Sequence, residues 1–267
     1  MRAVRLHKYI GNCGYTARRR AELLIQAGRV QVNGRVVTEL GTSIRPGKDE
    51  VRINGDIVTP VAPVTILFHK PPGCITSTHD THERLTVMDL LPRRMMAQGV
   101  KPVGRLDQDT AGLLILTSDG DLNHRVTHPR YEIEKEYEAV VRGRPSREAL
   151  LRLEKGIDIE GKLTEPARVT LAQPLPQHMG SRTRVRLVIH EGRKRQVKKM
   201  FDAIAHPVEQ LARIRVGGLE IGDLAPGAWR PLAAEEILLL TRGADGERVG
   251  VLKPREALAA EPAKDDA

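Results

Sequence analysis

The sequence has few aromatic residues: its 267 residues include two Phe, four Tyr and one Trp. Proteins that bind single-stranded nucleic acid without regard to its sequence stack successive bases on aromatic side chains. This chain has too few rings for an extended platform of that kind. Any recognition of nucleic acid is therefore expected to depend mainly on charge and shape.

Cysteine is also scarce, since Cys13 and Cys74 are the only two. They have no CxxC or Cys/His spacing that would indicate a zinc site or a disulfide framework, so we interpret both as packing or loop residues. No apolar run approaches the roughly 20 residues of a membrane span. The N-terminus lacks the apolar segment of a secretory signal. We expect a soluble, cytoplasmic protein that does not associate with membranes.

Positive charge, in contrast, is abundant. The 43 Lys and Arg residues exceed the 34 Asp and Glu residues, which gives a net charge of +9 and a pI near 9.8. This balance favours a polyanionic partner, because Lys and Arg release counterions when they bind phosphates. Residues 1–60 alone hold eleven basic and five acidic side chains, a net charge of +6. Nucleic acid is the first candidate partner, and the N-terminal part is its expected binding region.

The first 60 residues predict a small module of two helices and two hairpins. Residues 5–12 favour a short helix, and Thr16 is expected to cap a second helix that ends at Gly28. The Asn-Gly pairs at 33–34 and 54–55 each separate two short apolar segments. Asn-Gly accepts the positive φ angles of a type I′ turn, so each pair predicts a tight hairpin.

The second predicted helix carries a basic run made of Arg18, Arg19 and Arg20. A run of charges by itself more often only solvates a helix face. Here it accompanies hairpins and a strong positive charge, and this combination favours RNA binding. The module is too small to carry catalysis of its own.

Beyond a linker around Pro60 and Pro63, longer apolar segments predict a second domain. We expect strands at 65–68, 112–117, 137–141, 185–189 and 214–221, and a helix at 196–205. Strands and helices mix without regular βαβ spacing, which favours an α+β fold with a largely antiparallel mixed sheet and flanking helices. Residues 244–267 are polar and are expected to be disordered. The expected division is therefore 1–60, 64–243 and a tail at 244–267.

The most informative stretch is residues 102–120, PVGRLDQDTAGLLILTSDG. It places the Asp107 carboxylate in a glycine-flanked loop directly before an apolar strand, where a rigid scaffold can present a side chain to a cleft. Arg105 lies two residues before it, and a neighbouring cation favours the ionised form of a carboxylate. An ionised carboxylate is suited to act as a nucleophile or a base.

These residues resemble a known family. The stretches at 5–10, 18–20 and 27–34 are similar to an S4 RNA-binding domain. The stretches at 68–73, 102–120, 127–137, 190–201 and 224–232 resemble the pseudouridine synthases that carry an S4 domain and modify ribosomal RNA. The resemblance implies isomerisation of specific uridines to pseudouridine through a catalytic aspartate and base flipping. It implies neither a metal nor an organic cofactor.

The resemblance also implies roles for individual residues. Asp107 corresponds to the essential aspartate, Tyr137 to the tyrosine that packs on the uracil and takes a proton, and Lys198 to the basic residue that pairs with the aspartate. The residues implied to bind the substrate are Arg105, Leu113 and Leu114. The run of positive charges at 193–199 adds Arg193 and Arg195, which are expected near phosphate. The residues implied to bind RNA through the S4 domain are Arg5, Lys8, Arg18, Arg19, Arg20, Arg29 and Asn33.

Two positions depart from the family pattern. Lys198-Lys199 replaces the usual Arg-Arg, and lysine cannot form the planar bidentate pair that arginine forms with a carboxylate. Ala205 replaces a glycine before His206-Pro207, and alanine adds strain if that position has a positive φ angle.

Two other functions are compatible with the sequence. One is a non-catalytic ribosome-assembly factor that binds RNA through residues 1–60. The other is a metal-dependent nuclease that uses Asp107, Asp109 and Asp119, although Asp119-Gly120 favours a turn and no His lies at ligand spacing. For the synthase, a large-subunit rRNA target and a monomeric state are the working expectations.

Overall fold

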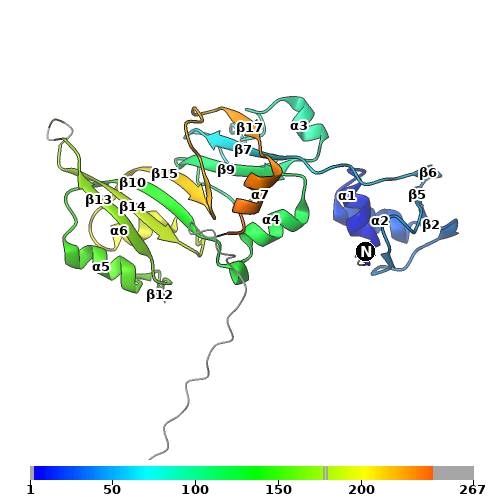
Figure 1. Ribbon diagram of the computed structural model, residues 1–267, viewed down its shortest axis with the longest axis horizontal. Helices are drawn as coiled ribbons and strands as arrows, with labels where there is room; N and C mark the ends of the chain where they lie inside the picture. Colours follow the sequence, from blue (N-terminus) through cyan, green and yellow to red (C-terminus); the bar gives the residue numbers. More distant parts are fainter. Residues whose placement is uncertain (1–2, 177, 179, 243–267) are drawn as a thin grey trace, which may run out of the picture.

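A computed structural model describes residues 3–176, 178 and 180–242 of the chain. Figure 1 shows a small N-terminal part, drawn in blue, joined by an extended segment to a larger part built on a sheet. The tail expected at 244–267 lies outside the described residues. Within those residues, no helix combines the length and apolar character needed to cross a lipid bilayer.

The N-terminal part contains the two helices and two hairpins that the sequence predicts. Its elements are β1 (Val4–Arg5), α1 (Leu6–Asn12), α2 (Arg18–Gln26), β2 (Val30–Val32), β3 (Arg35–Val36), β4 (Ser43–Ile44), β5 (Val51–Ile53) and β6 (Asp56–Ile57). Strands β3, β2, β5 and β6 form one antiparallel sheet in that order. Its core is separate from those of the larger part and includes Leu6, Ile10, Ile25, Val30 and Ile53.

The turns of this part confirm the hairpin predictions, whereas one predicted helix cap is wrong. Asn33 and Asn54 have φ angles of 50° and 54°, as type I′ turns require. Helix α2 begins at Arg18 after Ala17, which makes no side-chain capping bond. Thr16 is therefore not the N-cap, because a cap must be the residue that directly precedes the first helical turn.

The larger part confirms an α+β fold with a mostly antiparallel sheet. Its strands are β7 (Thr65–Lys70), β8 (Lys101–Pro102), β9 (Ala111–Thr117), β10 (Lys135–Arg142), β11 (Asp158–Ile159), β12 (Lys162–Leu163), β13 (Arg168–Pro174), β14 (Arg182–Ile189), β15 (Val208–Val216), β16 (Leu219–Glu220) and β17 (Trp229–Pro231). The main path of the sheet is β13-β14-β10-β15-β9-β7-β17. Among these described strands, only β15 and β9 run parallel to each other.

Helices cover the sheet, whose core falls into three clusters. They are α3 (Arg93–Ala97), α4 (Gly120–Thr127), the 3₁₀ helix η1 (Pro129–Tyr131), α5 (Arg147–Lys155), α6 (Gln196–Asp202) and α7 (Ala234–Leu239). Helices α5 and α6 pack on the half of the sheet that contains β10 and β14, through residues such as Leu153 and Phe201. Helix α5 is amphipathic and is capped by the Ser146 hydroxyl, which accepts from the Ala149 N–H at 3.1 Å.

The predicted helix at 196–205 ends at Asp202, and two further predictions differ from the structure. The strand expected at 214–221 is longer and interrupted: β15 starts at Val208, and β16 follows a tight turn at Gly217. Asp119 is the N-cap of α4, a helix that the sequence interpretation missed. The Asp119 carboxylate accepts hydrogen bonds from the N–H groups of Asp121 and Leu122. The same Asp-Gly pattern favours turns and helix starts, because in both the carboxylate accepts from nearby backbone N–H groups.

Ala205 has a φ angle of +61°, so the concern raised by the missing glycine is confirmed. The left-handed conformation is costly for a residue with a Cβ atom. We predict that Ala205→Gly stabilises the protein by about 0.5–1 kcal/mol, the relief of strain less the added entropy of the unfolded chain. Denaturant unfolding measures the change. Ala203→Gly is the matched control. Ala203 has a φ angle of −67°, which suits alanine, so this variant should be less stable than wild type. Equal losses of stability in the two variants would contradict the prediction.

Candidate active site

A pocket of about 600 Å³ lies where the loop before β9 faces β10, β15 and the start of α6. Its volume is in the range typical of small-molecule sites. The lining residues are Gly104, Arg105, Leu106, Asp107, Thr110, Tyr137, Ile189, Gly192, Arg193, Lys194, Arg195, Gln196, Val197 and Leu211. Arg105 and Asp107, from one loop, therefore share a cavity with Tyr137, which lies 30 residues further along the chain.

The parallel contact between β9 and β15 brings the Asp107 loop close to Tyr137. Gly112 of β9 pairs with Arg213 of β15, and Arg213 pairs on its other side with Tyr137 of β10. A Cβ atom on Gly112 would lie 2.2 Å from the carbonyl oxygen of Arg213, and the φ angle of Gly112 is +105°. Only glycine permits this close approach of the two strands.

Hydrogen bonds hold the backbone around Asp107. The Thr110 N–H donates to the Asp107 carbonyl at 3.1 Å, which closes a turn. The Thr76 hydroxyl donates to the Leu106 carbonyl at 2.8 Å, and both residues are buried. The Asp107 side chain itself is half-buried at the pocket wall. A fixed backbone with a partly accessible carboxylate suits a reactive group that must meet a substrate at a defined position.

Lys70 is the main contributor that the sequence interpretation missed. Its side chain is fully buried, and its ammonium donates to the carbonyls of Pro71, Gln108 and Thr110 at 3.1, 3.2 and 2.9 Å. Burial lowers the pKa of Lys70, while nearby acidic groups that include Asp109 and Asp107 act in the opposite direction. Lys70 thus joins the end of β7 to the loop that carries Asp107, and it places a positive charge behind that loop.

Tyr137 lies on β10, at the junction of two core clusters. Its ring packs against the cluster beneath α5 and α6 and also against the cluster beneath α3. Its cross-strand neighbours are Leu187 and Arg213. The ring is only partly buried and lines the pocket, so this wall of the pocket is aromatic.

Lys198 forms an ion pair with a different aspartate from the one expected. Its ammonium lies 2.5 Å from an Asp109 carboxylate oxygen. Among the described residues, no ion pair joins Lys198 to Asp107, so the predicted pairing is wrong for this structure. An ammonium is a compact charge, and from α6 it reaches the exposed carboxylate at the pocket rim. Burial opposes ionisation of Asp109, but the hydrogen bond and charge of Lys198 outweigh it, so the pKa of Asp109 is lowered.

The arginines predicted to bind the substrate differ in their surroundings. Arg105 is exposed at the pocket, and Arg195 is exposed 3.9 Å from Asp109. Arg193 also lines the pocket, but its guanidinium donates to the carbonyls of Lys162 and Leu163 and pairs with Glu191. Arg193 therefore holds the β12 segment. Arg105 and Arg195 are more accessible to a substrate than Arg193 is.

Leu113 and Leu114 do not line the pocket, contrary to expectation. Both are fully buried in β9 and pack into two different core clusters on opposite faces of the sheet. The apolar walls are formed instead by Ile189, Val197 and Leu211. These residues come from β14, α6 and β15, and only the pairing of distant strands identifies them.

The residues predicted to bind RNA in the N-terminal part fall into two groups. Arg18, Arg19 and Arg20 are exposed, as RNA binding requires. The other predicted residues also contact protein groups: Arg5 the Gly41 carbonyl, Lys8 the Asp121 carboxylate, Arg29 the Asn54 side chain and Asn33 the Asp49 carboxylate.

The carboxylates proposed for a nuclease are used in other ways. Asp119 caps α4, and Asp109 pairs with Lys198. Across the described part of the chain, no three His, Cys, Asp or Glu side chains gather in a group that could hold a metal ion. This arrangement gives the nuclease hypothesis no structural support.

Comparison with known proteins identifies the family of this chain. The sequence pattern of the RNA pseudouridylate synthases matches residues 64–203, and that of the S4 domain matches residues 4–51. Ribosomal large subunit pseudouridine synthase B of Bacillus subtilis is 42% identical over 241 residues, which cover 90% of this chain and 97% of the relative. The chain belongs to the RNA pseudouridine synthase family.

Other relatives agree with this membership in the pseudouridine synthase family. An uncharacterized RNA pseudouridine synthase of Aquifex aeolicus is 38% identical over 241 residues, which cover 90% of this chain and 94% of the relative. A crystal structure of a pseudouridylate synthase superposes with a TM-score of 0.62 at 31% identity and covers 89% of this chain and 99% of that one. The sequence resemblance is thereby confirmed, and the chain spans nearly the whole length of these pseudouridine synthases.

Lys135 is a partly buried lysine on the strand that carries Tyr137. It precedes Tyr137 by two residues on β10 and donates to the carbonyls of Ile133 and His190 at 2.8 and 3.4 Å. Burial lowers the pKa of Lys135 to about 8, and the charge of Arg213 acts in the same direction. The unfolded chain therefore binds more protons than the folded one between pH 8 and 10.5.

We predict that this lysine makes stability rise with pH in that window. One extra proton on the unfolded chain raises the free energy of unfolding by up to about 1.4 kcal/mol per pH unit. Unfolding of wild type and Lys135→Met by denaturant at pH 7 to 10 measures the effect, because the stability difference between them should change only above pH 8. Lys155→Met, at an exposed position of α5, is the matched control. Parallel pH profiles for wild type and Lys135→Met would contradict the prediction.

Proposed function

We propose that this chain isomerises specific uridines of ribosomal RNA, in the large subunit, to pseudouridine. The observation that carries the proposal is the shared pocket of Asp107 and Tyr137 in a member of the pseudouridine synthase family. The Bacillus subtilis relative, whose name specifies the large ribosomal subunit, supports the choice of RNA. The exposed arginines of α2 and the net charge of +9 support a polyanionic substrate.

The reaction begins when the target nucleotide leaves the RNA stack and enters the pocket. Unstacking costs a few kcal/mol, which contacts in the pocket must offset. Arg105 is exposed at the pocket and is suited to hold the place of the extruded nucleotide in the RNA. Arg195, near the rim, is suited to bind a neighbouring phosphate.

Asp107 then acts as nucleophile or base so that the bond between ribose C1′ and uracil N1 breaks. The detached uracil turns in the pocket and rejoins C1′ through C5. The C5 proton is lost and N1 gains one, so the product is an isomer of the substrate. Tyr137 packs on the uracil, and its hydroxyl is the proposed acceptor of the C5 proton. Ile189, Val197 and Leu211 supply the apolar walls that the free base contacts.

In this proposal the two parts of the chain divide the work. Residues 1–60 bind the RNA, and residues 64–243 hold the catalytic pocket. Lys198 acts through Asp109, because their ion pair holds the loop on which Asp107 lies.

The test is chemical mapping of pseudouridine in RNA treated with the purified protein. Unmodified large-subunit and small-subunit ribosomal RNA transcripts are incubated separately with wild type. The proposal expects new pseudouridines at one or a few positions of the large-subunit RNA. New pseudouridines only in the small-subunit RNA would show that the target lies in that subunit. No new pseudouridine in either RNA would contradict the proposed function.

A further inference from the structure

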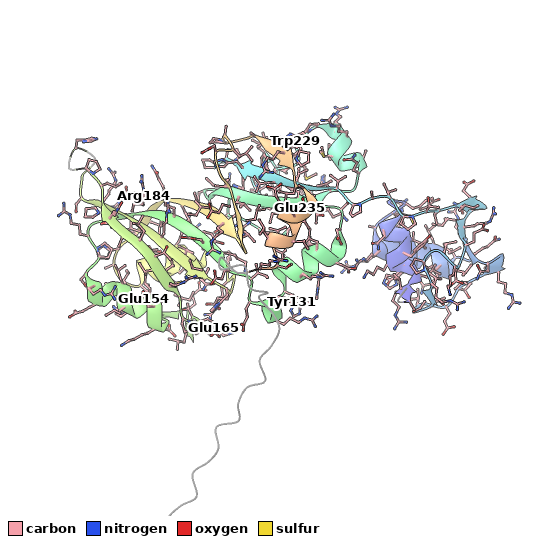
Figure 2. The ribbon with its side chains drawn as sticks, in the orientation of Figure 1. Tyr131, Glu154, Glu165, Arg184, Trp229 and Glu235 are labelled. Atoms are coloured by element: carbon pink, nitrogen blue, oxygen red, sulfur yellow. The ribbon has the colours of Figure 1, made fainter. Side chains whose placement is uncertain are left out.

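Helix α4 and the adjoining η1 expose a group of basic and aromatic side chains that the proposed mechanism does not use. His124, Arg125, His128 and Arg130 are exposed, and Tyr131 is partly buried. Figure 2 labels Tyr131 at the foot of this helix. We call these five residues the α4 surface.

The rings of the α4 surface form a cluster. The centroids of His124 and His128 are 4.8 Å apart, and Tyr131 meets them edge-on at 5.9 and 6.2 Å. The Arg130 guanidinium lies 4.4 Å from the centre of the Tyr131 ring. Planar rings and a guanidinium plane are the groups on which proteins stack unpaired RNA bases.

The positive charge of this surface has no acidic partner. Among the described residues, Arg125 and Arg130 take part in no ion pair. The acidic residues at the start of the same helix are already engaged, because Asp119 caps the helix and Asp121 pairs with Lys8 at 2.7 Å. Two uncompensated guanidinium groups next to a ring cluster suit phosphates rather than carboxylates of the protein itself.

The position of α4 connects the two parts of the molecule. Its first turn meets the N-terminal part through the Lys8–Asp121 pair and through Arg18, whose guanidinium lies over Gly120. Its middle and end face the catalytic loop: the Asn123 amide donates to the Pro102 carbonyl at 3.2 Å, and Thr127 packs against Gly104. Figure 1 shows α4 between the blue N-terminal part and the sheet.

We propose that the α4 surface binds the RNA strand that flanks the flipped nucleotide, with Arg125 and Arg130 on phosphates and the ring cluster against an unpaired base. The proposal rests on the proposed function, because the strand is that of the RNA substrate. The surface gives the RNA a continuous path from the arginines of α2 to Arg105 at the pocket.

Equilibrium binding to a fragment of unmodified large-subunit ribosomal RNA tests the phosphate contacts. The double variant Arg125→Ala/Arg130→Ala is expected to bind about tenfold more weakly, and its dependence of log K on log salt should lose about two units of slope. The matched control is Arg147→Ala/Arg152→Ala on α5, which removes the same charge from exposed positions away from α4. At saturating RNA, the rate of pseudouridine formation by the α4 variant should stay within about twofold of wild type.

The ring contact is tested at His124, which forms no side-chain hydrogen bond among the described residues. His124→Ala should weaken binding by a few fold, and His124→Phe, which retains a ring, should restore it. Equal affinity of the α4 and α5 double variants, with unchanged thermal midpoints, would overturn the proposal. Loss of binding in the α4 variant when wild type makes no pseudouridine would support this surface and reject only the proposed function.

Discussion

Replacement of Asp107 by asparagine is expected to lower kcat for pseudouridine formation by at least about a thousandfold, a typical cost of removing a reactive group. Asparagine has the same shape as aspartate, but its amide is neither a nucleophile nor a base at neutral pH. The Asp107 backbone is held by its neighbours, so the loop should remain in place. The measurement is single-turnover mapping of pseudouridine in the RNA that wild type modifies.

The control for this prediction is Asp109→Asn on the same loop. The Asp109 carboxylate is exposed and pairs with Lys198, so its loss should cost about tenfold or less. Both variants should bind RNA and unfold as wild type does. An Asp107→Asn protein with wild-type yield would disprove the catalytic role and favour the RNA-binding assembly factor instead.

Replacement of Lys70 by methionine has the second largest expected effect. Methionine fills a similar volume but removes the donor to three carbonyls. The Gln108 carbonyl keeps the Gly73 N–H and the Pro71 carbonyl keeps the Cys74 thiol, whereas the Thr110 carbonyl loses its donor. An unsatisfied buried carbonyl costs about 1–3 kcal/mol, so the loss of the donor to Thr110 should lower stability by about that amount. Displacement of the Asp107 loop by about 1 Å should lower kcat about a hundredfold.

Lys70→Met is expected both to destabilise the protein and to displace the Asp107 loop, and a control must separate these two effects. Leu153→Ala, in the core beneath α5, should destabilise the protein by about 2–5 kcal/mol but leave kcat of the folded protein nearly unchanged. Rates are compared at a temperature where circular dichroism shows each variant to be folded. A folded Lys70→Met protein with kcat within threefold of wild type would show that the lysine does not position the catalytic loop.

Local sequence signals predicted the N-terminal part well. Asn33 and Asn54 take the positive φ angles that their Asn-Gly turns require, and Gly28 ends α2 with a φ angle of +68°. These features depend on two to four adjacent residues, which is why the pattern is sufficient. The cap of α2 was predicted wrongly, because the helix start also depends on how the preceding residues approach it.

The candidate site was predictable only in part. The motif around Asp107 and its resemblance to a family identified the aspartate and Tyr137, and the structure places both at one pocket. Lys70 was missed because its three acceptors are backbone carbonyls, which have no signature in the sequence. Leu113 and Leu114 were misplaced because both faces of β9 are buried, so alternation along the strand does not indicate which side meets the pocket.

By itself, the amino-acid sequence determined the fold class, the two-part organisation and the positive charge, and it predicted a reactive carboxylate at position 107. Only the tertiary structure decided that Lys198 meets Asp109, that Lys70 holds the Asp107 loop and that Leu211 lines the pocket. The physical reason is the range of the interactions. Turns, helices and charge arise from neighbouring residues, whereas these contacts depend on the strand pairing between β9, β15 and β10, which glycine at position 112 makes possible.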